Sequence, residues 1–196
     1  MWEQWFNRLR DHLWASPEQQ LEAALRSRNA AALESLLDRH PDPGNLDPLL
    51  AGAILADWEE GAEALARRAG AWAAGMPALT LAVLDQKYEA LRGLLKAGLH
   101  PDTGDHHQAT ALMVAAQRGD TRALGMLLAA GAQPNCRDEE GDTALAYAVM
   151  QQARAAVSLL VAQGANPRLR NHDGLSPADR AADAEMVRLL EQSPEV

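Results

Sequence analysis

The clearest pattern in the chain is a group of apolar residues that recurs at helical spacing. Leu124, Leu127 and Leu128 lie three and four residues apart, so a helix would place them on one face. Equivalent apolar groups lie 33 residues before and after, within 91–95 and 157–161. A glycine follows each group, at positions 98, 131 and 164. Three recurrences at one fixed period predict stacked repeats, because a single helix pair cannot bury its apolar face alone.

Each unit is predicted to consist of a helix, a tight turn, a second helix and a loop. Thr110 and Thr143 precede the first helices, where a hydroxyl can accept a hydrogen bond from an otherwise unpaired backbone N–H. Gly131 closes the second helix, and we expect a left-handed conformation there that a valine would not tolerate. Gly61 is predicted to lie inside a helix, so the same substitution should be far milder there.

The pattern divides the chain into a short N-terminal segment and an array of repeats. Residues 1–16 form a predicted amphipathic helix, with Trp2, Trp5 and Phe6 on its aromatic face. Residues 17–196 hold about six units, of which the first two and the last are degenerate. Their predicted bounds are 17–41, 46–70, 75–104, 105–137, 138–170 and 171–193.

The repeats resemble those of the ankyrin family, whose pattern is D-x-x-G-x-T-P-L-H-x-A-A-x-x-G followed by an apolar helix and L-L-x-x-G-A. The match is best over residues 105–170 and weaker over 17–104 and 171–193. The resemblance implies an all-α solenoid of helix-turn-helix repeats with hairpin fingers, here with an extra N-terminal helix. Ala111 and Ala144 replace the family proline. Met113 and Ala146 replace its histidine, so the usual Thr–His hydrogen bonds should be missing.

Composition narrows the functional classes. The 196 residues carry a net charge of −9, which argues against nucleic acid as a partner because no basic patch would displace its counterions. A single cysteine, Cys136, excludes a disulfide framework and a multi-cysteine zinc site. We find no signal peptide, and no apolar run approaches the roughly 18 residues of a membrane span. These features, with 40 alanines and 16 arginines against 2 lysines, predict a cytoplasmic and bacterial protein.

No arrangement of residues indicates catalysis or a cofactor. The chain lacks the G-x-S-x-G, H-E-x-x-H and G-x-G-x-x-G motifs. His106 and His107, with His100 and Asp105, could suggest a metal site, but adjacent residues rarely face one ion. We therefore expect no enzymatic activity, no metal, no cofactor and no small-molecule substrate.

The ankyrin resemblance implies contact positions along the concave face and the finger tips. They fall on His106, His107, Gln117, Arg118, Arg137, Glu139, Glu140, Asp142, Met150, Gln151, Arg170 and His172. The acidic run 138–142 is either a solvated loop or a contact for a basic protein partner. The tryptophans, all within the first 72 residues, either fill gaps in the core or anchor an interface; a membrane-surface helix is a third alternative.

The predicted function is non-enzymatic binding of a protein partner. Within that class we favour a bacterial immunity or inhibitor protein that neutralises a specific toxin or enzyme. The alternative is a scaffold, assembly factor or regulatory subunit of a cytosolic complex.

Overall fold

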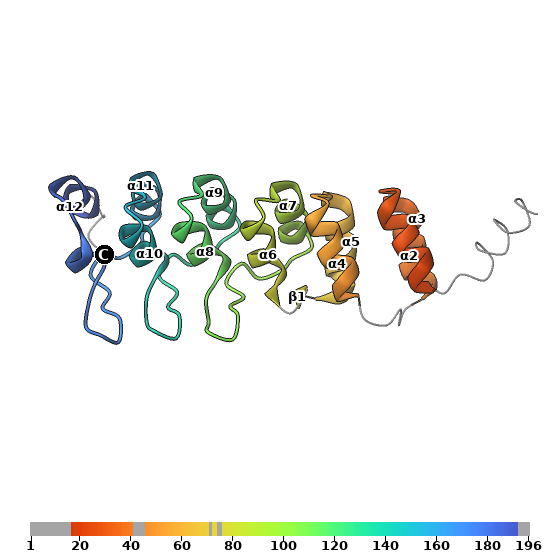
Figure 1. Ribbon diagram of the computed structural model, residues 1–196, viewed down its shortest axis with the longest axis horizontal. Helices are drawn as coiled ribbons and strands as arrows, with labels where there is room; N and C mark the ends of the chain where they lie inside the picture. Colours follow the sequence, from red (N-terminus) through yellow and green to blue (C-terminus); the bar gives the residue numbers. More distant parts are fainter. Residues whose placement is uncertain (1–16, 41–45, 71, 74–75, 192–196) are drawn as a thin grey trace, which may run out of the picture.

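The computed structural model describes residues 17–40, 46–70, 72–73 and 76–191, and the predicted N-terminal helix lies outside them. Within the described part, the helices form six consecutive pairs in a single row (Figure 1). The pairs are α2 (Pro17–Arg26) and α3 (Ala30–Arg39), α4 (Asp47–Leu55) and α5 (Glu59–Ala69), α6 (Ala78–Leu84) and α7 (Tyr88–Lys96), α8 (Ala111–Gln117) and α9 (Thr121–Ala129), α10 (Ala144–Met150) and α11 (Arg154–Ala162), and the 3₁₀ turn η1 (Ala178–Arg180) and α12 (Ala184–Glu191). This is the predicted all-α solenoid.

Helix starts and stops follow the sequence signals. The Thr110 and Thr143 hydroxyls accept hydrogen bonds from the backbone three residues on, at 3.4 and 3.3 Å. Met113 occupies the family's histidine position, and its sulfur accepts a hydrogen bond from the Thr110 N–H. The lost Thr–His pair is thus partly replaced by a thioether. Gly131 has a φ of +92°, the left-handed conformation that its position predicts.

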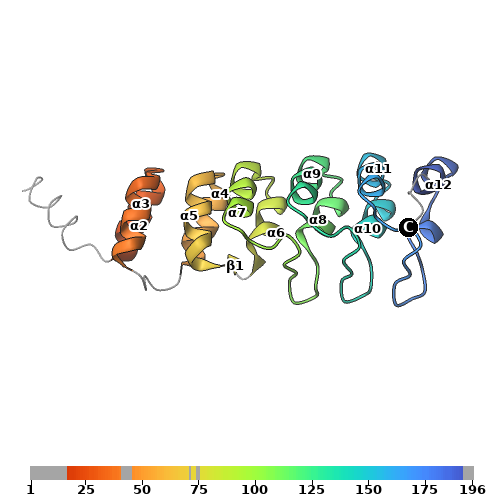
Figure 2. The same ribbon diagram turned by 180° about the vertical axis from the view of Figure 1, so that it is seen from behind.

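Three long fingers project from one edge of the row in both views (Figures 1 and 2). Each finger is shaped by one side chain whose Oδ1 accepts two backbone N–H groups in its own turn. The three side chains are Asp105, Asp138 and Asn171, spaced 33 residues apart. Among the described residues of these fingers, only Gly104 and Thr110 form a β-bridge. The fingers are therefore held mainly by side-chain turns.

The described residues of the first pairs form no such finger. Between α5 and α6 the chain forms only the short antiparallel strands β1 (Trp72–Ala73) and β2 (Met76–Pro77). Trp58 is 5% exposed and fills the space beside α5, which confirms a core role for this tryptophan. A β-carbon on Gly61 would lie 2.0 Å from the Trp58 ring, so the expectation that Gly61 tolerates a side chain is wrong.

The core is continuous along the row because each pair buries leucine and alanine against its neighbours. The largest fully buried side chains include Leu21, Leu50, Leu91, Leu112 and Leu124. Alanine at many of the remaining core positions keeps the helices close together. No helix of the described chain is long and apolar enough to cross a membrane.

Candidate protein-binding surface

The three finger tips are joined to one another by their backbones. The Glu139 N–H donates to the His107 carbonyl at 2.9 Å, and the His172 N–H donates to the Glu140 carbonyl at 3.0 Å. Each tip therefore lies against the next, and the tips form one row. His106, His107, Glu139, Glu140 and His172 are all exposed in that row.

Two of these side chains contact each other across the row. His107 Nδ1 lies 2.9 Å from Glu139 Oε2, and the Glu139 carboxylate raises the pKa of the imidazole. The His106 ring lies 4.1 Å from the His107 ring. Within the described residues no group of three histidine, cysteine or carboxylate side chains is arranged to hold a metal ion.

The acidic run 138–142 is not a uniformly exposed patch. Asp138 is 5% exposed, and its second carboxylate oxygen accepts a hydrogen bond from the Tyr147 hydroxyl at 2.6 Å. Burial, and then the Asp138 carboxylate, raise the pKa of Tyr147 well above its ordinary value. Asp138 therefore shapes the finger, and the exposed acids of the run are Glu139 and Glu140.

Asp142 also lies inside the fold. It is 9% exposed, and its Oδ1 lies 2.9 Å from the Arg180 guanidinium. The same guanidinium nitrogen lies 3.6 Å from the Met150 sulfur. Asp142 is therefore buried rather than exposed as expected, because its charge is paired at the base of the finger.

Arg137 and Arg170 are exposed, but their guanidinium groups bind the backbone of the fingers. Arg137 donates to the Gly141 carbonyl at 3.1 Å and to the Arg170 carbonyl at 2.5 Å. Arg170 donates to the Gly174 carbonyl and pairs with Asp179 at 3.0 Å. Both arginines thus stiffen the finger row, and their charges partly offset the carboxylates beside them.

A second exposed group lies where the first helices of the repeats end. Gln117 and Arg118 end α8, and Met150 and Gln151 occupy the equivalent positions of α10. All four are exposed, and Met150 is one of the few large apolar side chains of the described chain that reach solvent, at 43%. Large, partly exposed apolar residues of this kind are candidates for interface anchors.

The twelve predicted positions thus separate into three sets. The finger tips contribute five exposed residues, the ends of α8 and α10 contribute four, and Arg137, Arg170 and Asp142 bind within the fold. Sequence reasoning missed Tyr147 and Arg180, which hold the fingers through Asp138 and Asp142. These two residues are 33 apart, so the repeat register already marked them as equivalent positions.

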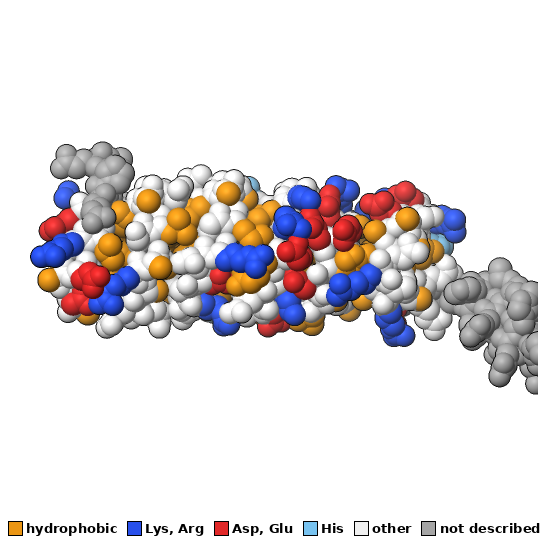
Figure 3. Space-filling view, turned by 90° about the horizontal axis from the view of Figure 1, so that it is seen from above, with side chains coloured by type: hydrophobic (Ala, Val, Ile, Leu, Met, Phe, Trp, Pro, Cys, Tyr) orange, Lys and Arg blue, Asp and Glu red, His pale blue; other side chains and the backbone are white. Residues whose placement is uncertain are grey.

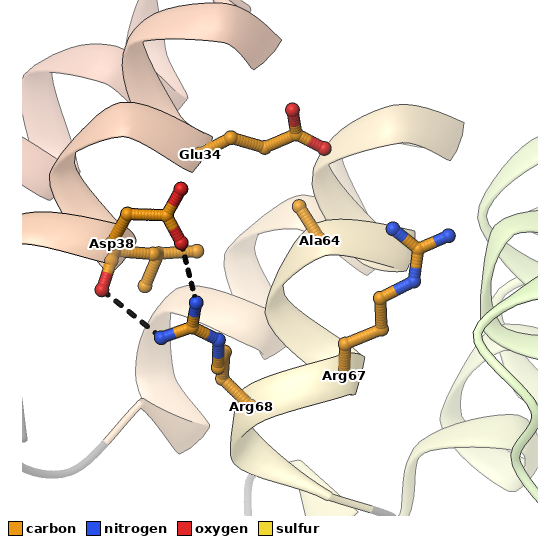
Figure 4. A pocket seen from close by; sticks show the side chains of 6 residues that line it. Glu34, Asp38, Ala64, Arg67 and Arg68 are labelled. Atoms are coloured by element: carbon orange, nitrogen blue, oxygen red, sulfur yellow. Dashed lines mark hydrogen bonds and ion pairs between the residues drawn. The ribbon is translucent and has the colours of Figure 1, made fainter. Parts of the chain in front are cut away.

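Two other places that could hold a ligand are occupied by internal contacts. A cleft of about 220 Å³ between α3 and α5 contains Arg68, which pairs with Asp38 at 2.6 Å and donates to the Leu37 carbonyl (Figure 4). Cys136 is half-buried, and burial, together with nearby Asp102, raises the pKa of its thiol. A raised thiol pKa disfavours the reactive thiolate, so this cysteine does not resemble a catalytic nucleophile.

Comparisons with known proteins agree with this geometry. Residues 112–195 match the family model of ankyrin repeats in three copies. The ankyrin repeat domain of Bcl-3, described as a unique member of the IkappaB protein family, is similar in structure, with a TM-score of 0.61 and 20% identity over 88% of this chain and 97% of that one. No curated protein is similar to the chain by sequence.

These matches indicate an interaction module and no catalytic family, because ankyrin repeats mediate contacts between proteins. Residues 112–195 therefore match the ankyrin-repeat family, and the described helix pairs before them share the fold of an ankyrin repeat domain.

Proposed function

We propose that this chain is a non-enzymatic module that binds a protein partner with a basic patch, and that binding inhibits the partner as an immunity protein inhibits a toxin. The binding surface consists of the finger tips (His106, His107, Glu139, Glu140 and His172) and the helix ends (Gln117, Arg118, Met150 and Gln151). The exposed Glu139–Glu140 pair on the middle finger is the observation that supports a partner with a basic patch.

Charged and apolar residues would have different roles on this surface. Glu139 and Glu140 project from a protein whose net charge is −9, so a basic partner is attracted from a distance. Met150 can enter an apolar pocket of the partner, and contacts of this type mainly determine how long a complex lasts. The polar ends of Gln117, Arg118 and Gln151 would supply directional hydrogen bonds around it.

Affinity capture from the native cell, followed by mass spectrometry, tests the proposal. A single stoichiometric protein whose activity falls when the purified chain is added supports inhibition. A multi-protein assembly without loss of activity contradicts inhibition and favours the scaffold alternative. Turnover of a substrate by the purified chain alone contradicts the non-enzymatic function.

Binding kinetics with the captured partner then test the surface. Glu139→Gln together with Glu140→Gln should slow association several-fold at low salt, with a smaller effect at high salt, because these charges steer the encounter. The matched control changes two exposed carboxylates far from the fingers, Glu22→Gln with Glu34→Gln. Equal association rates for both double variants would show that the finger tips are not part of the binding surface.

A further inference from the structure

The carboxylates of the finger tips have a different kind of neighbour from those over α5 and α7. On the face away from the fingers, Figure 3 shows acidic and basic side chains side by side over these helices, where Arg92 and Lys96 bind Glu59. Arginine and lysine keep their charge at every pH near neutrality. At the finger tips the group beside the carboxylate is a histidine, because His107 Nδ1 lies 2.9 Å from Glu139 Oε2. Histidine ordinarily gains its charge between about pH 5 and 8, so the charge beside Glu139 changes within the physiological range.

Backbone contacts hold His107 and Glu139 next to each other. The Glu139 N–H donates to the His107 carbonyl at 2.9 Å, and the His107 N–H donates to Asp105 Oδ1 at 2.8 Å. The two side chains therefore project from neighbouring turns that are themselves fixed. Both remain accessible to a partner, since their side chains are 57% and 60% exposed.

The groups around the His107 ring come from its own finger and from the next one. The carboxylates of Glu139, Asp105 and Glu140 favour the protonated ring, and Glu139 contributes most through its hydrogen bond. Desolvation of the ring opposes protonation, and so would a positive charge on His106, whose ring lies 4.1 Å away. The carboxylates prevail and raise the pKa of His107 above its ordinary value. In the free chain, His107 is therefore protonated at a higher pH than an isolated histidine.

A protonated His107 and a basic partner compete for the same carboxylate. When a lysine or arginine of the partner pairs with Glu139, the imidazole loses the contact that favours its proton. Binding then releases protons, so the association constant falls as the pH falls, by at most about tenfold per pH unit for each proton released. The decrease begins as the pH passes down through the raised pKa of free His107 and ends below the lower pKa of the bound form.

We propose that the finger tips form a pH-dependent binding surface, in which protonation of His107 weakens the binding of a basic partner at Glu139. This inference rests on the proposed function, since it requires a partner with a basic patch. It adds a direction to that function: the partner is held at neutral and mildly alkaline pH and is released in acidic surroundings.

Titration of the histidines by NMR tests the contact in the free, full-length chain. The midpoint for His107 should lie at a higher pH in the wild type than in Glu139→Gln, because the variant lacks the carboxylate that favours the proton. Glu34→Gln removes an exposed acid of α3 and should leave the His107 midpoint unchanged. Equal midpoints in the wild type and Glu139→Gln would overturn the proposal, whatever the natural partner is.

An oligolysine peptide then tests the effect on binding, because lysine keeps its charge throughout this pH range. The association constant, measured from the NMR shifts of the finger-tip amides, should fall several-fold to about tenfold between about pH 8 and about pH 6. His107→Gln should remove most of this fall, since glutamine cannot gain a charge. His100→Gln is the matched control and should keep it: His100 is exposed and lies 3.9 Å from Asp102, but it precedes the fingers. An equal fall in the wild type and His107→Gln would overturn the proposal.

One double variant separates this inference from the function on which it rests. Glu139→Gln together with Glu140→Gln should weaken oligolysine binding at about pH 8, because the tips then lack their exposed acids. Unchanged binding would contradict the basic partner itself, and the pH dependence with it. Weakened binding, combined with an equal fall in the wild type and His107→Gln on acidification, would contradict only the pH-dependent release.

Discussion

From α8 onward, backbone hydrogen bonds between fingers join neighbouring repeats in addition to side-chain contacts, whereas from α2 to α7 the links between the described residues are made by side chains. Glu139 and His172 each donate from one finger to the finger before it. In the first pairs, Arg68 reaches from α5 to Asp38 on α3, and Lys96 reaches from α7 to Glu59 on α5. The chain thus uses two different kinds of link between the same kind of helix pair.

The fingerless half also brings its helices closer together. Gly93 of α7 faces the Glu59 carbonyl of α5 so closely that a β-carbon would lie 2.2 Å from the oxygen. The next repeat carries Met126 at the equivalent position, where the helices must lie farther apart. Short loops therefore favour tight, glycine-dependent packing, while long fingers tolerate wider spacing because they add links of their own.

The largest expected effect comes from adding a β-carbon at this close contact between α5 and α7. Gly93→Ala should cost about 3 kcal/mol, because the obstacle is backbone and cannot rotate away. Urea denaturation gives the loss, and hydrogen exchange should accelerate first in α2–α5. Gly125→Ala in α9 is the control: no atom lies within 4 Å, and alanine favours the helix by up to about 1 kcal/mol. Equal stability of the two variants would contradict the difference in packing.

In the fingered half, the buried ion pair should give the next largest effect. Asp142→Asn leaves the Arg180 guanidinium without its carboxylate, at side-chain exposures of 12% and 16%. We expect a loss of about 2–3 kcal/mol in the free energy of unfolding. Glu140→Gln changes an exposed acid in the same finger and should cost almost nothing. Two similar losses would mean that the pair contributes no more than a surface charge.

The glycine that closes α9 tests the repeat register. Gly131→Val should lower the free energy of unfolding by about 2 kcal/mol, since a β-branched residue is strained at a φ of +92°. No atom lies within 4 Å of the added carbon, so the loss reports backbone conformation rather than crowding. Ala130→Val, one residue earlier at a φ of −83°, is the control for thermal unfolding. A control that melts as early as Gly131→Val would contradict the conformational cause.

Sequence reasoning succeeded where one residue acts within its own turn, as with Thr110 and Gly131. It could not give the contacts that depend on how far apart two helices lie. Gly93 and Gly61 look like ordinary helix glycines, and only the neighbouring Glu59 and Trp58 make them necessary. In the candidate site, the finger-tip positions followed from the ankyrin resemblance, whereas the pairing of Asp142 depends on a residue 38 positions away.

The smallest effect should come from the ion pairs that join α5 to α7. Hydrogen bonds from Arg92 and then Lys96 lower the pKa of Glu59 to about 2, from an ordinary value of 4.5. The Glu59 side chain is 14% exposed, so we expect Glu59→Gln to cost about 1 kcal/mol at neutral pH.

The pH dependence of this loss follows from the direction of the shift. A carboxyl group whose pKa is lowered by folding stabilises the fold above its unfolded pKa, and this contribution disappears as the pH falls. Wild type and Glu59→Gln should therefore differ fully above pH 4.5 and converge as the pH approaches 2. Thermal melts of both proteins across that range measure the convergence. A stability difference that does not change with pH would show that Glu59→Gln acts through packing. The side-chain links between α5 and α7 would then make no electrostatic contribution to stability through Glu59.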